Sequence, residues 1–208
     1  MVDGPGHRAR ITGVIVPIRA FAHAKARLSA ELDAEHRAIL ARRLADRVVG
    51  AAGPMPVVVV TGAGEVRAWA ADRGLTVVDD PGSLDAAARA GRDHLRSIGC
   101  RRVIVAHADL PWATDLSALA RDASQPVVAL VPCHRDDGTP VLSVPAGLPF
   151  DFAYGPGSFR RHVAEARRRG YGIRVVRDAA LAFDVDVPSD LAALDHDPRF
   201  GVVTPVDA

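Results

Sequence analysis

Three aspartates in two short segments are the residues of this sequence most suited to chemistry. Asp109 follows an apolar run, in HADLPW, and Asp184 and Asp186 lie two positions apart in FDVDV. Side chains alternate along a strand, so Asp184 and Asp186 are expected on one face, roughly 7 Å apart at the backbone. Carboxylates that converge repel each other unless a cation lies between them. Such a set favours Mg²⁺, which takes a few carboxylates and completes its shell with phosphate oxygens and water.

Each acidic position also has a simple structural interpretation. The stretch DVDVPSDL can be a strand that leaves the core and a capped helix that follows, with solvated acids at the join. Asp109 can cap the turn after it. Asp115 and Asp190 fit the starts of helices, where an acid complements the helix dipole, and we leave them out of the candidate site.

Basic residues and a glycine-rich turn provide candidate anion-binding groups. Lys25 and Arg27 lie in PIRAFAHAKARLS, where they could contact phosphates or form a solvated turn. In YGPGSFRRH, Gly155 precedes Ser158, a candidate N-cap of a helix whose free amides and nearby cations suit an anion. Thr139 adds a hydroxyl in DDGTP. An ordinary turn into a capped helix would explain the same glycines.

Short apolar runs recur between helical patterns and must position these residues. The runs cover residues 11–18, 56–61, 75–80, 101–108 and 126–132. Val- and Ile-rich runs without alternation are typical of strands buried on both faces, so we predict a doubly wound, mostly parallel α/β sheet with helices on both faces. Residues 133–178, rich in Gly and Pro, are predicted to form an excursion of loops and short strands, followed by a helix at SFRRHVAEARRR, over the carboxyl edge, where substrates bind. We predict one domain over residues 1–208.

The composition excludes several other classes of protein. The chain has 208 residues, 49% of them hydrophobic, and a net charge of +1, which gives no support to nucleic-acid binding. The apolar run near the N-terminus spans about six residues, too few for a signal peptide or a membrane span. We therefore expect a cytoplasmic protein that binds neither membrane nor nucleic acid. No HExxH, GxSxG, P-loop or GxGxxG motif is present.

The order of the motifs resembles that of a known family of nucleotidyltransferases. VPIRAFAHAKARLS, HADLP, DDGTPVLSVPA, YGPGSFRRH and FDVDVPSDL together resemble the CofC/FbiD family, from about residue 12 to 194. Its members are guanylyltransferases of coenzyme F-420 biosynthesis that act on 2-phospho-L-lactate, phosphoenolpyruvate or 3-phospho-D-glycerate. The resemblance implies the nucleotidyltransferase fold, with GTP and a small phosphorylated three-carbon acid as substrates and a homodimer as one candidate assembly.

The resemblance also implies roles for the candidate residues. It implies that the GTP phosphates are contacted by Lys25 and Arg27. Mg²⁺ would be held by Asp109, Asp184 and Asp186, and the phospho-acid would be bound by Thr139, Gly155 and Ser158. The acceptor phosphate would attack the α-phosphorus of GTP and release pyrophosphate. Because this nucleophile is already an anion, the reaction needs positioning and charge neutralisation rather than a general base.

Two residues of this chain depart from the pattern of the family, and two other functions are alternatives to a guanylyltransferase. Relatives often carry Asn where this chain has Pro140 and Asp85, which puts acceptor identity and nucleotide recognition in question. Phosphoenolpyruvate is the first choice of acceptor.

One alternative function is that of a molybdenum-cofactor-type nucleotidyltransferase, although those usually have a Gly-rich loop that PIRAFAHAKARLS lacks. The other is a non-catalytic nucleotide-binding protein, against which the three acids argue.

Overall fold

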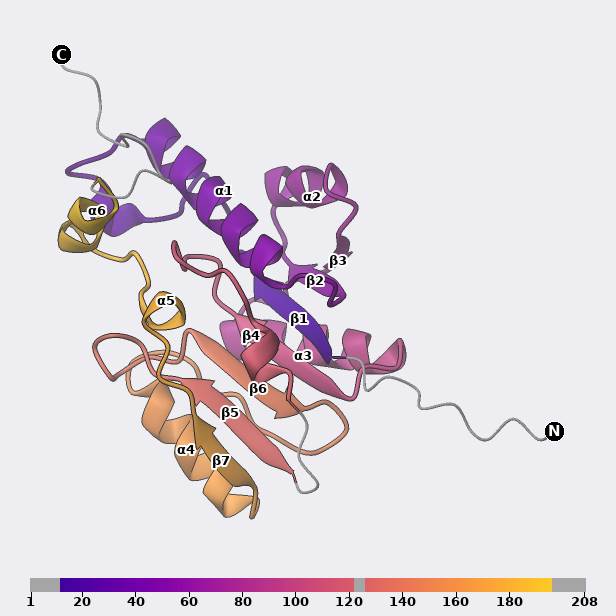
Figure 1. Ribbon diagram of the computed structural model, residues 1–208. Coiled ribbons are helices and arrows are strands. Elements are labelled where there is room, and N and C mark those ends of the chain that lie inside the picture. Colours follow the sequence, from indigo (N-terminus) through magenta and orange to yellow (C-terminus); the bar gives the residue numbers. More distant parts are fainter. Residues whose placement is uncertain (1–11, 122–125, 196–208) are drawn as a thin grey trace.

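The computed structural model of the chain describes residues 12–121 and 126–195, which contain a seven-stranded sheet (Figure 1). The strands are β1 (Thr12–Pro17), β2 (Val57–Val60), β3 (Thr76–Val78), β4 (Arg102–Ala106), β5 (Val127–Val131), β6 (Val141–Pro145) and β7 (Gly172–Val175). Their order is β3-β2-β1-β4-β6-β5-β7, and every neighbouring pair is parallel except the two that β6 makes. The predicted mostly parallel sheet is confirmed.

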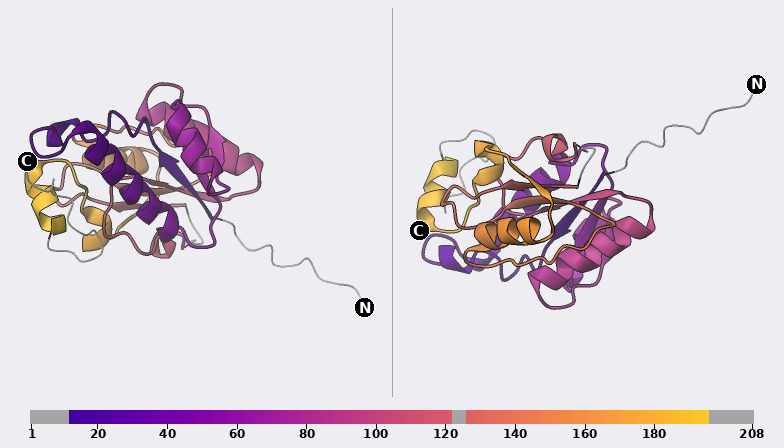
Figure 2. Two further views of the ribbon diagram at one scale, coloured as in Figure 1. Left: turned by 90° about the horizontal axis from the view of Figure 1, so that it is seen from above. Right: turned by 90° about the horizontal axis from the view of Figure 1, so that it is seen from below.

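Helices cover both faces of this sheet (Figure 2). They are α1 (Ala34–Ala51), α2 (Gly64–Ala71), α3 (Leu84–Ser97), α4 (Ser158–Arg168), α5 (Ala179–Ala182) and α6 (Pro188–Asp195), with 3₁₀ turns η1 (Ala26–Leu28) and η2 (Ser117–Leu119). Along β1, Val14 and Val16 pack in the core with α1 and α2, whereas Ile15 packs in the core with α3 and α4. Because both faces of the strand are buried, its apolar run shows no alternation.

Local sequence rules account for where the main helices begin. The side chain of Asp33 accepts a hydrogen bond from the backbone N–H of His36 at the start of α1. Ser83 caps α3 in the same way by accepting from Ala86 N–H. Each cap satisfies one of the four amides that a helix start leaves without a partner.

Residues 133–178 are more regular than a loop-rich excursion. They hold a short strand and then a helix, as predicted, but the strand β6 lies inside the sheet between β4 and β5. β7 adds a further strand beside β5. The run VLSVP in β6 is short and contains Ser143, a polar residue whose buried hydroxyl donates to Leu119 O and accepts from Arg102. The sequence therefore carried only a weak strand signal there.

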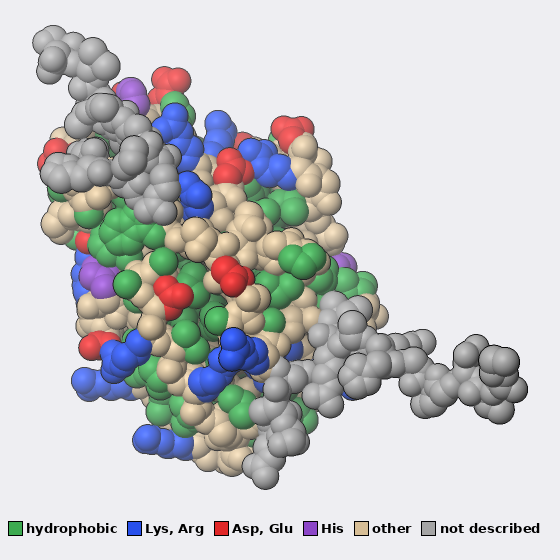
Figure 3. Space-filling view, viewed as in Figure 1, with side chains coloured by type: hydrophobic (Ala, Val, Ile, Leu, Met, Phe, Trp, Pro, Cys, Tyr) green, Lys and Arg blue, Asp and Glu red, His purple; other side chains and the backbone are tan. Residues whose placement is uncertain are grey.

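The surface carries charges of both signs (Figure 3), in agreement with the net charge of +1. Acidic and basic side chains are interspersed on the face that Figure 3 shows. Within the described ranges, no helix is both long enough and apolar enough to cross a membrane.

Candidate functional site

The predicted site residues come from chain segments that all reach the carboxyl edge of the sheet. Lys25 follows β1, Asp109 follows β4, and Thr139 lies between the end of β5 and the start of β6. Asp184 and Asp186 follow β7 and α5. Ligands of parallel sheets bind at this edge because the connecting loops converge there.

The segment with the paired aspartates is not a regular strand, contrary to our prediction. Residues 183–187 belong to none of the strands, and the N–H of Val185 donates to Asp109 O at 3.3 Å. Val185 is fully buried beside η1, α1 and α6, whereas Asp184 and Asp186 on either side of it are only partly buried. The alternation that we expected therefore holds, and this segment brings both acids beside the loop after β4.

Lys25 is bound to the acids rather than solvated. Its Nζ lies 2.7 Å from Asp109 Oδ2 and 3.7 Å from Asp186 Oδ1, and its side chain is 10% exposed. The backbone of Lys25 is left-handed, with φ 55°, a conformation that L-residues rarely adopt. Such conformations tend to occur where the surrounding structure needs a side chain in one place.

Arg27 lies at the rim of the same cluster. Its Nη1 is 3.4 Å from Asp186 Oδ2, and its side chain is 74% exposed. Surface ion pairs of this kind contribute little to stability, so Arg27 is free to contact a ligand at small cost.

The electrostatics of the acids show that they share one space. Burial alone would raise the pKa of Asp109, but the charges of Lys25 and His107 outweigh it, so its pKa lies below the ordinary value. Burial and the carboxylates of Asp109 and Asp186 together raise the pKa of Asp184. The carboxylates of Asp109 and Asp186 thus act on that of Asp184, and the ammonium of Lys25 offsets part of their charge.

The loop after β5 contributes two residues that the sequence analysis missed. His134 Nδ1 lies 3.2 Å from Asp184 Oδ1, and Arg135 Nη1 lies 3.7 Å from the same oxygen. The only signal was the charge cluster HRDD, which polar loops commonly carry. Asp190 holds Arg135, at 2.7 Å, and also accepts from the backbone N–H groups of Asp186 and Val187. Its predicted place in the first turn of a helix is confirmed.

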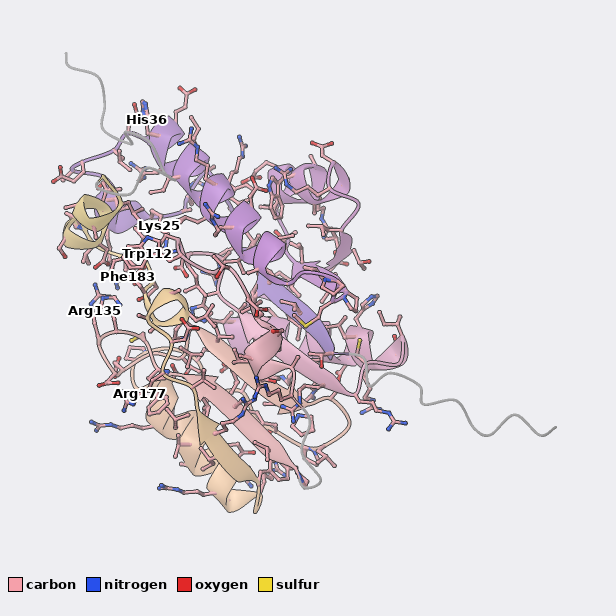
Figure 4. The ribbon with its side chains drawn as sticks, viewed as in Figure 1. Lys25, His36, Trp112, Arg135, Arg177 and Phe183 are labelled. Carbon is pink, nitrogen blue, oxygen red and sulfur yellow. The ribbon has the colours of Figure 1, made fainter. Side chains whose placement is uncertain are left out.

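Ring contacts hold the chain at Phe183, the residue before Asp184. The ring of Phe183 lies 4.3 Å from that of Trp112 and 4.9 Å from that of His134. In Figure 4, Lys25, Trp112, Phe183 and Arg135 follow one another down the same side of the molecule. This packing limits the positions that the neighbouring Asp184 carboxylate can take.

The acids could hold a magnesium ion, although they do not form a ready-made cage. Among the described residues, no group of three or more His, Cys, Asp or Glu side chains is arranged to hold a metal ion. However, Asp109 Oδ1 and Asp184 Oδ1 are buried and make no hydrogen bond of regular geometry, even with His134 near the latter. Buried carboxylate oxygens without partners are costly, and hard oxygen donors of this kind fit Mg²⁺.

A cavity of about 360 Å³ adjoins the Lys25–Asp109 pair. Its walls come from the end of β1, residues 18–25, Leu84 and the His107–Asp109 segment. That volume is within the range of small-molecule sites. A larger hollow of about 570 Å³, between Arg43 on α1 and Thr114, contains none of the predicted site residues. The smaller cavity is therefore the better candidate for a nucleotide.

The predicted acceptor residues lie together, but as an internal network. Thr139 and Ser158 are both buried, and their hydroxyls are 3.3 Å apart. Gly155 is exposed and has φ +101°, so the turn requires glycine there. The structure brings these three residues to one end of α4.

The start of α4 differs from our prediction of an N-capping serine with free amides. Gly157, with φ +73°, is the N-cap, and Ser158 is the first residue of the helix. The carboxylate of Asp137 accepts from Gly157 N–H at 2.9 Å, and its carbonyl accepts from Phe159 N–H. Arg161 donates to backbone carbonyls of the preceding turn. An acid of the chain already binds where we expected an external anion.

The two residues that depart from the resemblance both make specific contacts. The carboxylate of Asp85 accepts from Tyr154 N–H at 2.7 Å, a bond that an Asn side chain could also accept. The carbonyl of Pro140 accepts from His107 N–H at 2.9 Å. Both contacts connect segments at the cavity of about 360 Å³ to segments near the predicted acceptor residues.

Comparison with known sequences gives a consistent family. The model of the family described as "Guanylyl transferase CofC like" matches residues 12–195. A phosphoenolpyruvate guanylyltransferase of Sphaerobacter thermophilus is 36% identical, over 88% of this chain and 92% of its own. A 3-phospho-D-glycerate guanylyltransferase of Phenylobacterium zucineum is 32% identical, over 88% and 89%. A 2-phospho-L-lactate guanylyltransferase of Methanothermobacter thermautotrophicus is 29% identical, over 88% and 83%.

Solved structures agree on the fold. A protein of Desulfovibrio desulfuricans G20, classed with the nucleotide-diphospho-sugar transferases, superposes with a TM-score of 0.72 at 14% identity, over 91% of this chain and 92% of the other. A nucleotidyl transferase of Methanothermobacter thermautotrophicus superposes with a TM-score of 0.62 at 18% identity, over 93% and 100%. At such identities the likeness concerns the fold alone.

Proposed function

This chain belongs to the family of CofC-like guanylyl transferases, and we propose that it transfers GMP from GTP to the phosphate of a small phospho-acid. The observation that carries the proposal is the cluster of Lys25, Asp109, Asp184 and Asp186 beside a cavity of about 360 Å³. This cluster provides one buried cation and three acids next to space for a nucleoside. The motifs of the family thus coincide with the charged edge of the sheet.

In the proposed reaction, an oxygen of the acceptor phosphate forms a bond to the α-phosphorus of GTP. The bond from that phosphorus to the oxygen of the β-phosphate breaks, and pyrophosphate leaves. Lys25 binds oxygens of the triphosphate and neutralises the charge that develops there, and Arg27 contacts it from the rim. Mg²⁺, held by Asp109, Asp184 and Asp186, would supply further neutralisation of the phosphates.

Thr139, Gly155 and Ser158 bind the acceptor in this proposal. A three-carbon phospho-acid presents a phosphate and a carboxylate, so it needs hydrogen-bond donors at two points. The two hydroxyls serve one anionic group and the exposed turn at Gly155 serves the other. We propose phosphoenolpyruvate as the preferred acceptor, because relatives from Sphaerobacter thermophilus, Roseiflexus castenholzii and Rubrobacter xylanophilus carry that name. A role in coenzyme F-420 biosynthesis, a cytoplasmic location and a homodimer stay predictions from the sequence.

Pyrophosphate release tests this proposal. The purified protein is incubated with GTP, ATP, CTP or UTP and each of the three phospho-acids, with Mg²⁺ or with a chelator. We expect release that requires GTP, Mg²⁺ and one acceptor, preferably phosphoenolpyruvate. Asp109→Asn should abolish it, whereas Asp115→Asn, which alters only the turn at Ser117, should not. Release with CTP in place of GTP, or with no acceptor among the three, would contradict the proposal.

A further inference from the structure

A buried histidine, His162, contacts the hydroxyl pair that we assign to the acceptor. Its Nδ1 lies 3.1 Å from Thr139 Oγ1, and its side chain is fully buried. His162 follows Ser158 by one turn of α4, so both side chains lie on the same side of the helix. The histidine therefore reaches the acceptor groups through Thr139 rather than directly.

The backbone determines which nitrogen of His162 carries the proton. The N–H of Ala153 donates to Nε2 at 3.0 Å, and a backbone amide can only donate. Nε2 is therefore unprotonated, and the neutral ring carries its hydrogen on Nδ1. Burial, with the charges of Arg161 and His107, lowers the pKa of His162 to about 4, and the Tyr154 ring packs against it at 4.8 Å. The ring consequently stays neutral near pH 7.

This tautomer controls the hydrogens of the two hydroxyls. His162 Nδ1–H donates to Thr139 Oγ1, and one hydrogen joins the hydroxyls of Thr139 and Ser158. Two hydroxyls own two hydrogens, so one hydrogen is not used within this network and is left for a further acceptor. With the opposite tautomer, Nδ1 would accept the hydrogen of Thr139 and Ser158 would donate to Thr139, which leaves none. Only the tautomer that the Ala153 N–H requires leaves a donor that suits an anionic oxygen.

We infer that His162 is a positioning residue that orients the Thr139–Ser158 hydroxyl pair as a donor to an anionic oxygen, carboxylate or phosphate, of the acceptor. This inference rests on the proposed function, since it concerns the same acceptor site. It requires no charge on His162. It also explains the need for a buried imidazole at this position, where an apolar side chain would fill the space equally well.

Two neutral substitutions separate positioning from packing. In His162→Asn, the side-chain amide can replace the Nδ1–H donor to Thr139, whereas in His162→Gln it can replace only the acceptor for Ala153 N–H. We expect His162→Gln to raise the KM for phosphoenolpyruvate by about ten- to a hundredfold, the effect of one lost hydrogen bond to a charged group. His162→Asn should raise it much less, and neither should change the KM for GTP.

If His162 only fills space, both substitutions should change the KM for phosphoenolpyruvate to the same extent. Equal KM values in the two variants would therefore overturn the inference. The ¹⁵N chemical shifts of His162 provide a second readout that needs no turnover. A neutral ring protonated at Nδ1 supports the inference, and a ring protonated at Nε2 overturns it. If the wild-type protein transfers no GMP to any acceptor, the proposed function fails, while the shifts still decide the tautomer.

Discussion

Lys25 and the acids around it form the part of the molecule where single residues decide the chemistry. Lys25 bridges Asp109 and Asp186, while Asp184 is held by His134 and Arg135 on the far side. Lys25 and Asp109 could be proposed from the sequence because they follow apolar runs, and Asp184 and Asp186 because they alternate with apolar residues in FDVDV. His134 and Arg135 could not, because only the tertiary fold brings their polar loop against Asp184.

The contribution of Lys25 can be measured against that of its neighbour. We predict that Lys25→Ala lowers kcat/KM for GTP by roughly 100-fold or more, because it removes a buried cation from the developing charge. Arg27→Ala should have a smaller effect, since its side chain is 74% exposed and solvent screens it. Steady-state kinetics with GTP at saturating acceptor provide the comparison. Unchanged kinetics in Lys25→Ala would remove Lys25 from the reaction.

The opposite pKa shifts of two acids predict opposite effects on stability. The pKa of Asp109 is lowered, so its carboxylate stabilises the fold at neutral pH, and this is lost as the pH falls through the folded pKa. The pKa of Asp184 is raised, so its favourable contribution is present below the unfolded pKa and is lost as the pH rises through the folded value. In a chelator at pH 7, Asp109→Asn should lower the Tm by a few degrees and Asp184→Asn should raise it.

The control for this pair is the same measurement at acid pH. Near pH 3.5 the carboxyls of Asp109 and Asp184 approach protonation in the unfolded wild-type chain. The Tm of Asp184→Asn should therefore exceed that of wild type by less than it does at pH 7. A Tm of Asp184→Asn below that of wild type at pH 7 would show that the acids do not repel each other in the metal-free protein.

At the level of elements, helix α3 lies unusually close to strand β1. A Cβ built on Gly91 in α3 would lie 2.5 Å from Ile15 Cγ2, and one on Gly13 would lie 2.6 Å from Leu95 Cδ2. Two glycines thus permit the contact that brings Leu84, at the start of α3, to the cavity proposed for the nucleotide. The sequence predicted the helix from its pattern and the strand from its continuous apolar run. The distance between them could not be predicted, because it depends on which faces of the two elements pack together.

A matched pair of glycine substitutions tests this packing. Gly91→Ala should lower the free energy of unfolding by up to about 2 kcal/mol, because overpacking of Ile15 exceeds the gain of roughly 1 kcal/mol in helix propensity. Gly50→Ala in α1, where a Cβ meets nothing within 4 Å, should raise it by up to about 1 kcal/mol. Denaturant unfolding of both variants provides the values. Equal stabilisation by the two would show that α3 can move away from β1 freely.

For the molecule as a whole, strand direction determines where the chemistry lies. Six strands run in one direction, and β6 runs in the opposite direction. Residues 132–140, which join the end of β5 to the start of β6, therefore also lie at the carboxyl edge. The sequence predicted the five parallel strands β1 to β5 because their apolar runs are continuous, whereas β7 (Gly172–Val175) has no such run and was not predicted. It could not place β6, whose five residues include a buried serine that needs partners from Arg102 and Leu119.

A single domain over the whole chain stays a prediction, and the sheet supports it. β6 pairs with both β4 and β5, so the two halves of the sheet share one hydrogen-bonded ladder. We therefore expect one cooperative transition on thermal unfolding, with the same midpoint by circular dichroism and by Trp112 and Trp69 fluorescence. Two separated transitions would divide the chain into two units.

The identity of the product tests the central claim most directly. The protein is incubated with GTP, phosphoenolpyruvate and Mg²⁺, and the mixture is followed by ³¹P NMR. Transfer of GMP predicts pyrophosphate together with a new pair of coupled resonances from a P–O–P linkage between guanosine and the acid. The appearance of GDP and inorganic phosphate instead, or of no new phosphorus species with any of the three acids, would contradict the account.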